Sequence, residues 1–178
     1  MGAAILAVGC DMDSFQGFSD EVAGLPGKYD TAVGGRLLLC MEGAAGDWER
    51  SSAVPEERCL GCIALRNVAG EAGCAEIKRL FAREGRARGQ RLGQGLTIAI
   101  AREAERLGYD RLVLDTLERL PHAVRLYESL GFRRRDAYVH NPEADAVFFE
   151  IDLATLLASV GGEASAAEGA ATAAAGSG

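Results

Sequence analysis

The sequence predicts one domain of the α/β or α+β class, in which helices cover a central sheet. Three observations lead to this expectation. The chain of 178 residues is long enough to bury the core of one domain. In residues 147–153 an apolar side chain stands at every second position, as in a strand, whereas residues 92–107 place apolar side chains on one face of a helix. The segment 111–116 contains a continuous apolar run, which is typical of a strand covered on both faces.

The elements are expected in the order helix, three strands, helix, strand, helix, and a final strand or hairpin. A short first helix ends at Gly24 and Pro26, because neither residue suits a helix interior. Strands are expected at 36–41, 59–67 and 73–82. The first two of these form a hairpin with a long polar connection.

Both longer helices end at a glycine, the residue that most readily adopts the left-handed conformation after a last helical turn. The earlier of these two longer helices runs from Leu92 to Gly108, and the later one contains Tyr127 and ends at Gly131. Residues 156–178 consist mostly of Ala, Gly and Ser, so we expect a disordered tail there.

The composition argues against nucleic acid as a partner. The chain has 26 Asp and Glu against 19 Lys and Arg, a net charge of −7, whereas phosphate backbones select basic surfaces. The acidity mildly favours a cationic or small polar partner. The N-terminus has neither the basic region of a signal peptide nor the length of a membrane span. We therefore expect a cytoplasmic protein with no membrane partner.

The five cysteines lack the density of a disulfide framework, which favours a reducing compartment. Cys59 and Cys62 form a CxxC pair, but they lie in an expected strand, where positions three apart point to opposite faces. No second CxxC or nearby histidine supplies the other ligands of a zinc site. We expect these two residues to lie in the core, and we expect no metal.

The most informative segment is EIKRLFAREGRARGQRLGQG, residues 76–95. An apolar strand here leads into a loop rich in Gly and Arg and then into a helix. Free backbone N–H groups at a helix N-terminus, together with nearby positive charge, form a receptor for a phosphate-bearing ligand.

Taken together, the segments resemble the GNAT superfamily of acyl-CoA-dependent N-acetyltransferases. The resemblance runs over about residues 14–153 and is carried by these strings in order: FQGF, LPGKY, LGCIALR, CAEIKRLFA, RGQRLG, LGYDRLVLDTL, LYESLGF and FFEIDL. It implies a mixed, mostly antiparallel sheet covered by helices, with a splayed V between the two central parallel strands. It also implies a domain over residues 1–155. Family members begin with a strand and a helix, which this chain has in shortened form.

The resemblance implies acetyl-CoA as cosubstrate. The family's cofactor motif, Q/R-x-x-G-x-G/A, fits from Gln90 as QRLGQG or from Arg88 as RGQRLG. We prefer the register from Arg88, which puts Arg91 where the first glycine belongs. The residues then expected at the pyrophosphate are Arg88, Gly89, Gln90, Arg91, Gly93 and Gln94. In relatives the preceding strand carries a bulge and pairs with pantetheine, which here implicates Leu80 and Ala82, with the Leu80 N–H also polarising the thioester carbonyl.

The resemblance also implies two catalytic residues. Tyr127 stands where relatives use a tyrosine hydroxyl as the general acid near the CoA sulfur, and its alternative role is that of a core aromatic. Glu76 stands where several relatives place a general base that acts directly or through water. Its alternative role is a strand carboxylate paired with Lys78 or Arg79.

The acceptor side is less well defined by the sequence. Tyr138 and Asn141 lie in a turn that borders the acceptor pocket in relatives, and a turn role for Asn141 beside Pro142 is the alternative. Arg79, like Arg66, could bind an acceptor carboxylate, the alternative being an internally paired or solvated arginine. His122 could be a base, a cap or a solvent-facing residue.

The sequence therefore predicts an N-acetyltransferase that moves acetyl from acetyl-CoA to a primary amine, by direct attack without an acyl-enzyme. A small-molecule acceptor is expected, and a homodimer is left open. The alternative is a non-catalytic module that binds acyl-CoA.

Overall fold

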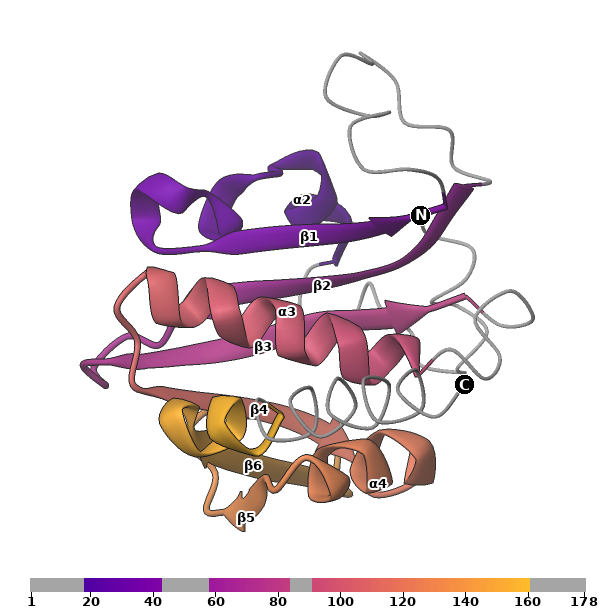
Figure 1. Ribbon diagram of the computed structural model, residues 1–178, viewed down its shortest axis with the longest axis vertical. Coiled ribbons are helices and arrows are strands. Elements are labelled where there is room, and N and C mark those ends of the chain that lie inside the picture. The colour runs from indigo at the N-terminus through magenta and orange to yellow at the C-terminus, as the bar shows by residue number, and fades with distance from the viewer. Residues whose placement is uncertain (1–17, 43–57, 84–90, 161–178) are drawn as a thin grey trace, which may run out of the picture.

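The computed structural model describes residues 18–42, 58–83 and 91–160, whose strands form one sheet in the order β1-β2-β3-β4-β6-β5 (Figure 1). The strands are β1 (Arg36–Met41), β2 (Cys59–Asn67), β3 (Cys74–Ala82), β4 (Arg111–Leu117), β5 (Arg133–Arg135) and β6 (Ala146–Asp152). Neighbouring strands are antiparallel, except that β3 and β4 are parallel. The mixed, mostly antiparallel sheet expected from the sequence is confirmed.

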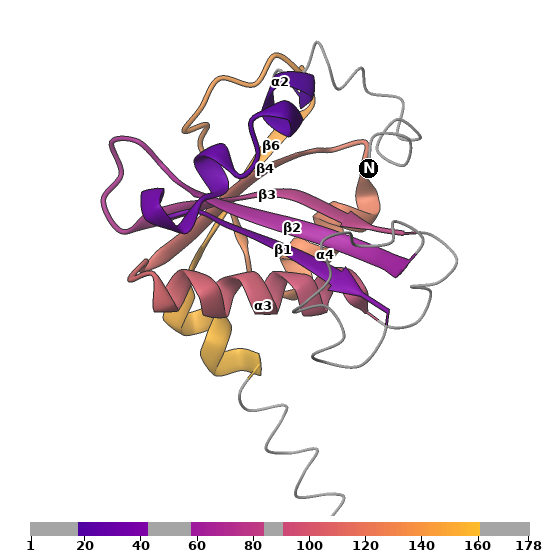
Figure 2. The same cartoon turned by 90° about the horizontal axis from the view of Figure 1, so that it is seen from above.

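Helices lie on both faces of this sheet. The helices are α2 (Phe18–Ala23), the short 3-10 turns η2 (Gly27–Tyr29) and η3 (Thr31–Val33), α3 (Leu92–Arg106) and α4 (Pro121–Ser129). Figure 2 shows α3 along one face and α2 on the other. Because α4 shares one hydrophobic cluster with α3, it packs on the α3 face of the sheet. The face that carries α2 is called the acceptor face below, and the other the α3 face.

The core fills the space between the sheet and α3. Leu96, Ile100 and Ala104 recur every four residues along the helix and are buried against the sheet. The sheet contributes the strand positions of the same face, including Leu65 and Leu114. Each of the large buried aliphatic side chains stabilises the fold by about 1.5–3 kcal/mol. The core thus fixes β2, β3 and β4 relative to α3, which positions the site described next.

The folded part of the chain extends beyond the expected boundary at residue 155. Residues 153–160 are helical, and Leu156 is completely buried in the core together with Leu153. These two leucines lie three positions apart, so both face the core from one side of a helix. The expectation of disorder is therefore wrong for residues 156–160, and 161–178 lie outside the described residues.

Candidate active site

The two parallel strands separate partway along their length. β3 and β4 pair at Cys74 with Arg111, at Ala75 with Leu112, and at Glu76 with Val113, and their ladder ends there. β3 nevertheless continues to Ala82 and β4 to Leu117. The splayed V that the sequence predicts is confirmed, and Glu76 lies at its apex.

A bulge interrupts β3 beyond the apex. Cys62 faces Phe81 and Ala64 faces Lys78, which leaves two residues of β3, Arg79 and Leu80, opposite one residue of β2. Arg79 adopts the left-handed conformation with φ of 59°, which is uncommon for a residue with a side chain. Such a bulge bends a strand and increases its twist, so it contributes to the separation of β3 from β4.

The end of β3 has backbone groups that face away from β2. The Arg83 N–H donates to the Leu60 carbonyl at 2.8 Å, which directs the backbone groups of residue 83 toward β2. Because these directions alternate along a strand, the backbone of Ala82 faces the opposite edge, on the side of β4. Leu80 directly follows the bulge residue. This geometry is compatible with the predicted pantetheine contacts of Ala82 and Leu80.

Helix α3 begins with a strained residue. Arg91 is the N-cap and has a φ of 47°, a conformation that glycine adopts at no steric cost. This conformation agrees with the register in which Arg91 takes the place of a glycine. The first intrahelical bond runs from Gly95 N–H to the Arg91 carbonyl, so the amides of Gly93 and Gln94 have no intrahelical acceptor. The predicted residues Arg88, Gly89 and Gln90 lie outside the described residues.

Glu76 is at the centre of a polar network on the acceptor face. Its side chain is 2% exposed and accepts hydrogen bonds from Arg66 of β2 and from Tyr138 at 2.9 Å, while Lys78 Nζ lies 3.0 Å away. The alternative of a carboxylate paired with Lys78 is thus observed. Oε1 accepts the hydrogen bond from Tyr138 and contacts Lys78, whereas Oε2 accepts the hydrogen bond from Arg66. Among the described residues, one acceptor position therefore remains on Oε2.

The network continues across the V to β4. Lys78 Nζ lies 2.6 Å from Asp115 Oδ1, and Asn141 Nδ2 donates to Asp115 Oδ2 at 2.8 Å. Tyr138 and Asn141 are therefore brought to Glu76 and Asp115, as neighbours of one polar cluster. The sequence signal for Asp115 is weak: a single carboxylate at the end of an otherwise apolar strand, where a buried charge requires a partner.

Tyr127 lies in α4, on the α3 face of the sheet. Its side chain is 5% exposed and packs against Phe132 and Phe149, with ring centroids 5.5 and 6.2 Å away. Burial raises the pKa of Tyr127, and the charge of Asp115 raises it further. The phenol therefore keeps its proton at neutral pH, as a general acid must, and it also fills the core.

The side chains of two other candidates are engaged elsewhere. Arg79 donates through Nε to Glu21 of α2 at 2.6 Å and is 11% exposed, so the internally paired alternative is the one observed. His122 is exposed at the start of α4, with Nδ1 3.2 Å from an Arg125 nitrogen. Neither side chain lines the pocket described next.

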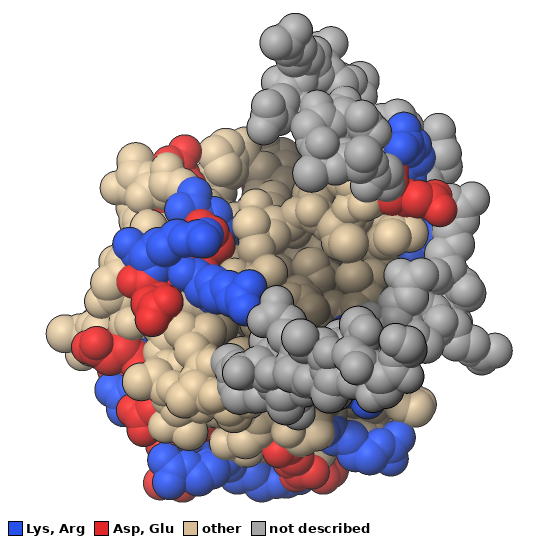
Figure 3. Space-filling model, in the orientation of Figure 1, with Lys and Arg blue, Asp and Glu red and all other residues tan. Residues whose placement is uncertain are grey.

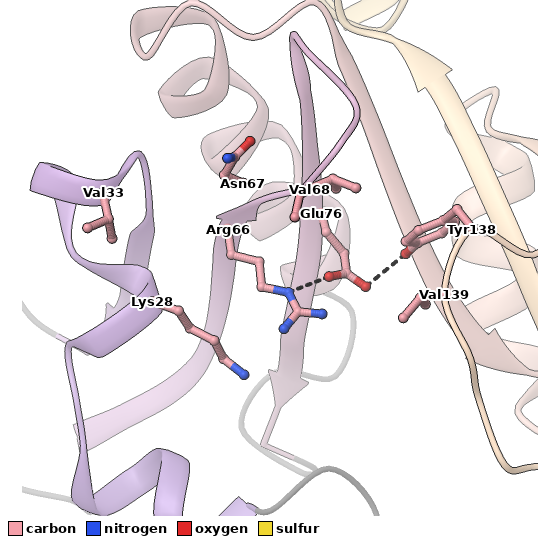
Figure 4. Close-up of a pocket in the computed structure, with 9 residues that line it drawn as sticks. Lys28, Val33, Arg66, Asn67, Val68, Glu76, Tyr138 and Val139 are labelled. Carbon is pink, nitrogen blue, oxygen red and sulfur yellow. Dashed lines mark hydrogen bonds and ion pairs between the residues drawn. The ribbon is translucent and has the colours of Figure 1, made fainter.

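A pocket of about 420 Å³ opens on the acceptor face next to Glu76. Its lining includes Lys28, Val33, Arg66, Glu76, Tyr138 and Val139. Figure 4 shows Arg66 and Tyr138 extending toward Glu76 from opposite sides, with Lys28 beside Arg66. The pocket thus borders the polar network at the apex of the V.

The basic side chains do not form a continuous surface. On the face seen in Figure 3, Lys and Arg are interspersed with Asp and Glu around an uncharged centre. Two of the three arginines of β5 are paired in the same way, Arg134 with Glu118 and Arg135 with Glu71. This pattern gives no support to a nucleic-acid interface.

The remaining observations concern the Cys62 thiol, metal ligands and membrane spans. Burial raises the pKa of Cys62 to about 11, and this thiol donates to the Arg79 carbonyl at 3.3 Å. Across residues 18–42, 58–83 and 91–160, no group of three His, Cys, Asp or Glu side chains is arranged to hold a metal ion. In the same ranges, no helix has the length and apolar character of a membrane span.

Comparisons with known proteins agree with this geometry. The model of the acetyltransferase (GNAT) family matches residues 36–132. An uncharacterized N-acetyltransferase of Schizosaccharomyces pombe is 38% identical over 140 residues, which cover 79% of this chain and 77% of that protein.

Solved structures share the fold at low sequence identity. A GNAT acetyltransferase of Staphylococcus aureus superposes with a TM-score of 0.61 at 18% identity, covering 84% of this chain and 89% of its own. An acetyltransferase of Streptococcus agalactiae gives 0.58 at 22% identity, with 76% of each chain covered. These structures show the shared fold, and the family match together with the relative in S. pombe shows that the chain belongs to the GNAT family and is an N-acetyltransferase.

Proposed function

We propose that this N-acetyltransferase transfers acetyl from acetyl-CoA to a primary amine of a small molecule, by direct attack on the thioester. The observation that supports the proposal is the separation of β3 from β4, with Glu76 at the apex on the acceptor face and Tyr127 packed on the α3 face. Acetyl-CoA is the acetyl donor of the family. Its acyl end would enter the V from the α3 face, and the amine would approach from the acceptor face.

The cofactor would be held by backbone groups. The amides at the start of α3 and the helix dipole favour the pyrophosphate, together with the loop residues Arg88–Gln90. The Ala82 and Leu80 backbone would pair with pantetheine in the manner of an added strand. The Leu80 N–H would stabilise the negative charge that develops on the thioester oxygen.

The proton transfers would then use one residue on each face. The amine nitrogen attacks the carbonyl carbon, the C–S bond breaks, and the sulfur takes its proton from the Tyr127 hydroxyl. The proton released by the amine passes to Glu76. Because the Glu76 oxygens already receive three partners and Leu80 lies four residues farther along β3, the proton would reach Glu76 through a chain of water molecules.

The size of the pocket supports a small acceptor. A volume of about 420 Å³ lies within the range typical of small-molecule sites, which is about 300–1,000 Å³. An acceptor bound there would lie beside the apex of the V, with its amine directed along the V toward the thioester.

Replacing Tyr127 with Phe tests the proposal. The kcat for acetyl transfer should fall by roughly 100-fold or more, because the leaving thiolate loses its proton donor, while the Kd for CoA stays unchanged. The matched control is Tyr109→Phe, which removes a hydroxyl that donates to the Gly34 carbonyl at 2.7 Å. An unchanged kcat in Tyr127→Phe would show that the general-acid role is wrong.

A further inference from the structure

Arg66 has hydrogen-bonding capacity that the polar network does not use. Within the part of the chain that the structure describes, its guanidinium forms a hydrogen bond only through Nε, which donates to Glu76 Oε2. The side chain is 27% exposed and lines the pocket, so its two terminal nitrogens are accessible from there. A guanidinium held in place by a buried carboxylate is a well-oriented receptor for an anion.

Lys28 adds a second positive charge to the same pocket. Its ammonium pairs with Glu21 and remains 39% exposed. In Figure 4 its side chain extends alongside Arg66, with both charged ends on the same side of the pocket. Among the charged residues that line the pocket, Lys28 and Arg66 are positive and Glu76 is negative. This excess of one positive charge favours a ligand group with one negative charge, although the chain as a whole is acidic.

Glu76 is poorly suited to bind a second ammonium group of a ligand. Its charge is already compensated by Arg66 and Lys78, and Tyr138 occupies a further acceptor position. A diamine would therefore place its distal ammonium next to two cations without a free carboxylate to offset them. The same position suits a carboxylate.

The position of the pocket also sets the spacing of the two functional groups of the ligand. The pocket lies at the level of Glu76, whereas Leu80, the expected thioester position, is four residues farther along β3, on the order of 10 Å away. An acceptor whose amine reaches the V leaves its other end in the pocket. Val33, Val68 and Val139 line that space and suit a chain of methylene groups.

From these contacts we propose that the acceptor is an amine whose far end carries a carboxylate, which binds to Arg66 and Lys28. This inference rests on the proposed function, because the amine is taken to react at the V. It gives Arg66 two tasks, since the residue holds Glu76 through Nε and binds the acceptor through its terminal nitrogens. Arg66 and Lys28 are thus residues that determine specificity.

The test compares three series of amines of matched chain length: ω-aminocarboxylates, alkylamines and diamines. We expect the kcat/KM of the aminocarboxylates to exceed that of the alkylamines by roughly tenfold, as a charge-assisted bidentate contact provides. Arg66→Gln and Lys28→Gln should each lower this ratio. Because the ratio of the two kcat/KM values is taken within each variant, any loss of activity caused by a displaced Glu76 affects both substrates and cancels. Arg106→Gln, the same change in charge on the exposed end of α3, should leave the ratio unchanged.

A binding measurement separates this inference from the proposed function. Calorimetry with the CoA-saturated protein should give a lower Kd for the aminocarboxylates than for the matched alkylamines, without any turnover. Binding without acetylation of any series would contradict the proposed transfer to small amines and leave the carboxylate site intact. A preference for diamines, or ratios that Arg66→Gln and Lys28→Gln do not change, would overturn the carboxylate site.

Discussion

Lys78 and Asp115 join the two central strands where their backbone pairing has ended. Lys78 Nζ on β3 lies 2.6 Å from Asp115 Oδ1 on β4, beyond the last backbone pair at Glu76 and Val113. Both side chains are more than nine-tenths buried. The two strands of the V are therefore connected by a side-chain ion pair in place of the ladder.

Replacing Lys78 with Met should destabilise the protein strongly. The change leaves Asp115 and Glu76 buried without their shared cation, which costs about 3–5 kcal/mol when one partner of a buried pair is removed. The double variant Lys78→Met/Asp115→Asn should recover part of this loss. Urea unfolding measures both changes. Arg134→Met, which breaks an exposed pair with Glu118, should cost far less, and an equal loss would contradict the burial argument.

Glu76→Gln distinguishes a proton acceptor from a structural carboxylate. If Glu76 receives the proton of the amine, kcat should fall by roughly 100-fold. Asp115→Asn serves as the matched control, because it alters the same network without removing the proposed base. If both variants lose activity only in proportion to their loss of stability, Glu76 has a structural role alone.

Arg91→Gly should stabilise the protein despite the usual effect of glycine. Relief of the left-handed conformation returns about 1–2 kcal/mol, and the added freedom of glycine in the unfolded chain offsets about 0.5–1 kcal/mol of it. A small rise in Tm is expected. Arg102→Gly, on the exposed surface of the same helix, should lower stability by about 1 kcal/mol. Equal losses in the two variants would be incompatible with strain at Arg91.

The two glycines of the first turns of α3 should respond differently to alanine. A Cβ at Gly95 meets open space, so Gly95→Ala should stabilise by about 0.5–1 kcal/mol. A Cβ at Gly93 lies 3.1 Å from Leu126 Cδ2, so Leu126 must shift and the gain should be smaller or lost. Thermal unfolding of the two variants measures the difference. If Gly93→Ala gains as much as Gly95→Ala, Leu126 adjusts without cost.

The pairing of Glu21 should make stability depend on pH in the acid range. Burial alone would raise its pKa, but hydrogen bonds from Arg79 and Lys28 outweigh burial and lower the pKa to about 2. The stabilisation is thus complete above the ordinary value of 4.5 and is lost as the pH falls toward about 2. Glu21→Gln should reduce Tm at neutral pH and flatten its decline in acid, with Glu105→Gln, on the exposed side of α3, as control. A decline as steep as in the unchanged protein would assign the acid sensitivity to other groups.

Periodicity and glycine placement in the sequence were sufficient to locate most elements. The expected strands at 36–41 and 59–67 coincide with β1 and β2, and Gly108 and Gly131 adopt the left-handed conformation expected after helices. These features depend on residues close together in the chain. The boundary at residue 155 failed because Leu156 and Leu157, just before a stretch of small residues, join Leu153 in holding the helix at 153–160 against the core.

The polar network could not be derived in the same way. Its members come from β2, β3, β4 and the segment around Tyr138, and which oxygen each one contacts depends on the register of four separate segments. Asp115 illustrates the difficulty, because its partners Lys78 and Asn141 are distant in sequence. Glu76 could be chosen as a candidate from the sequence, but the neighbours that restrict its chemistry could not.

The ion pair between Arg79 and Glu21 has a consequence for how this enzyme can change. It ties the strained residue of the β3 bulge to α2, the helix that precedes Lys28 in the chain. Substitutions in α2 should therefore show epistasis with those at the bulge, since a change on one side alters the backbone on the other. Laboratory evolution of acceptor preference should then proceed most readily at Val33 and Val139, which line the pocket and are exposed.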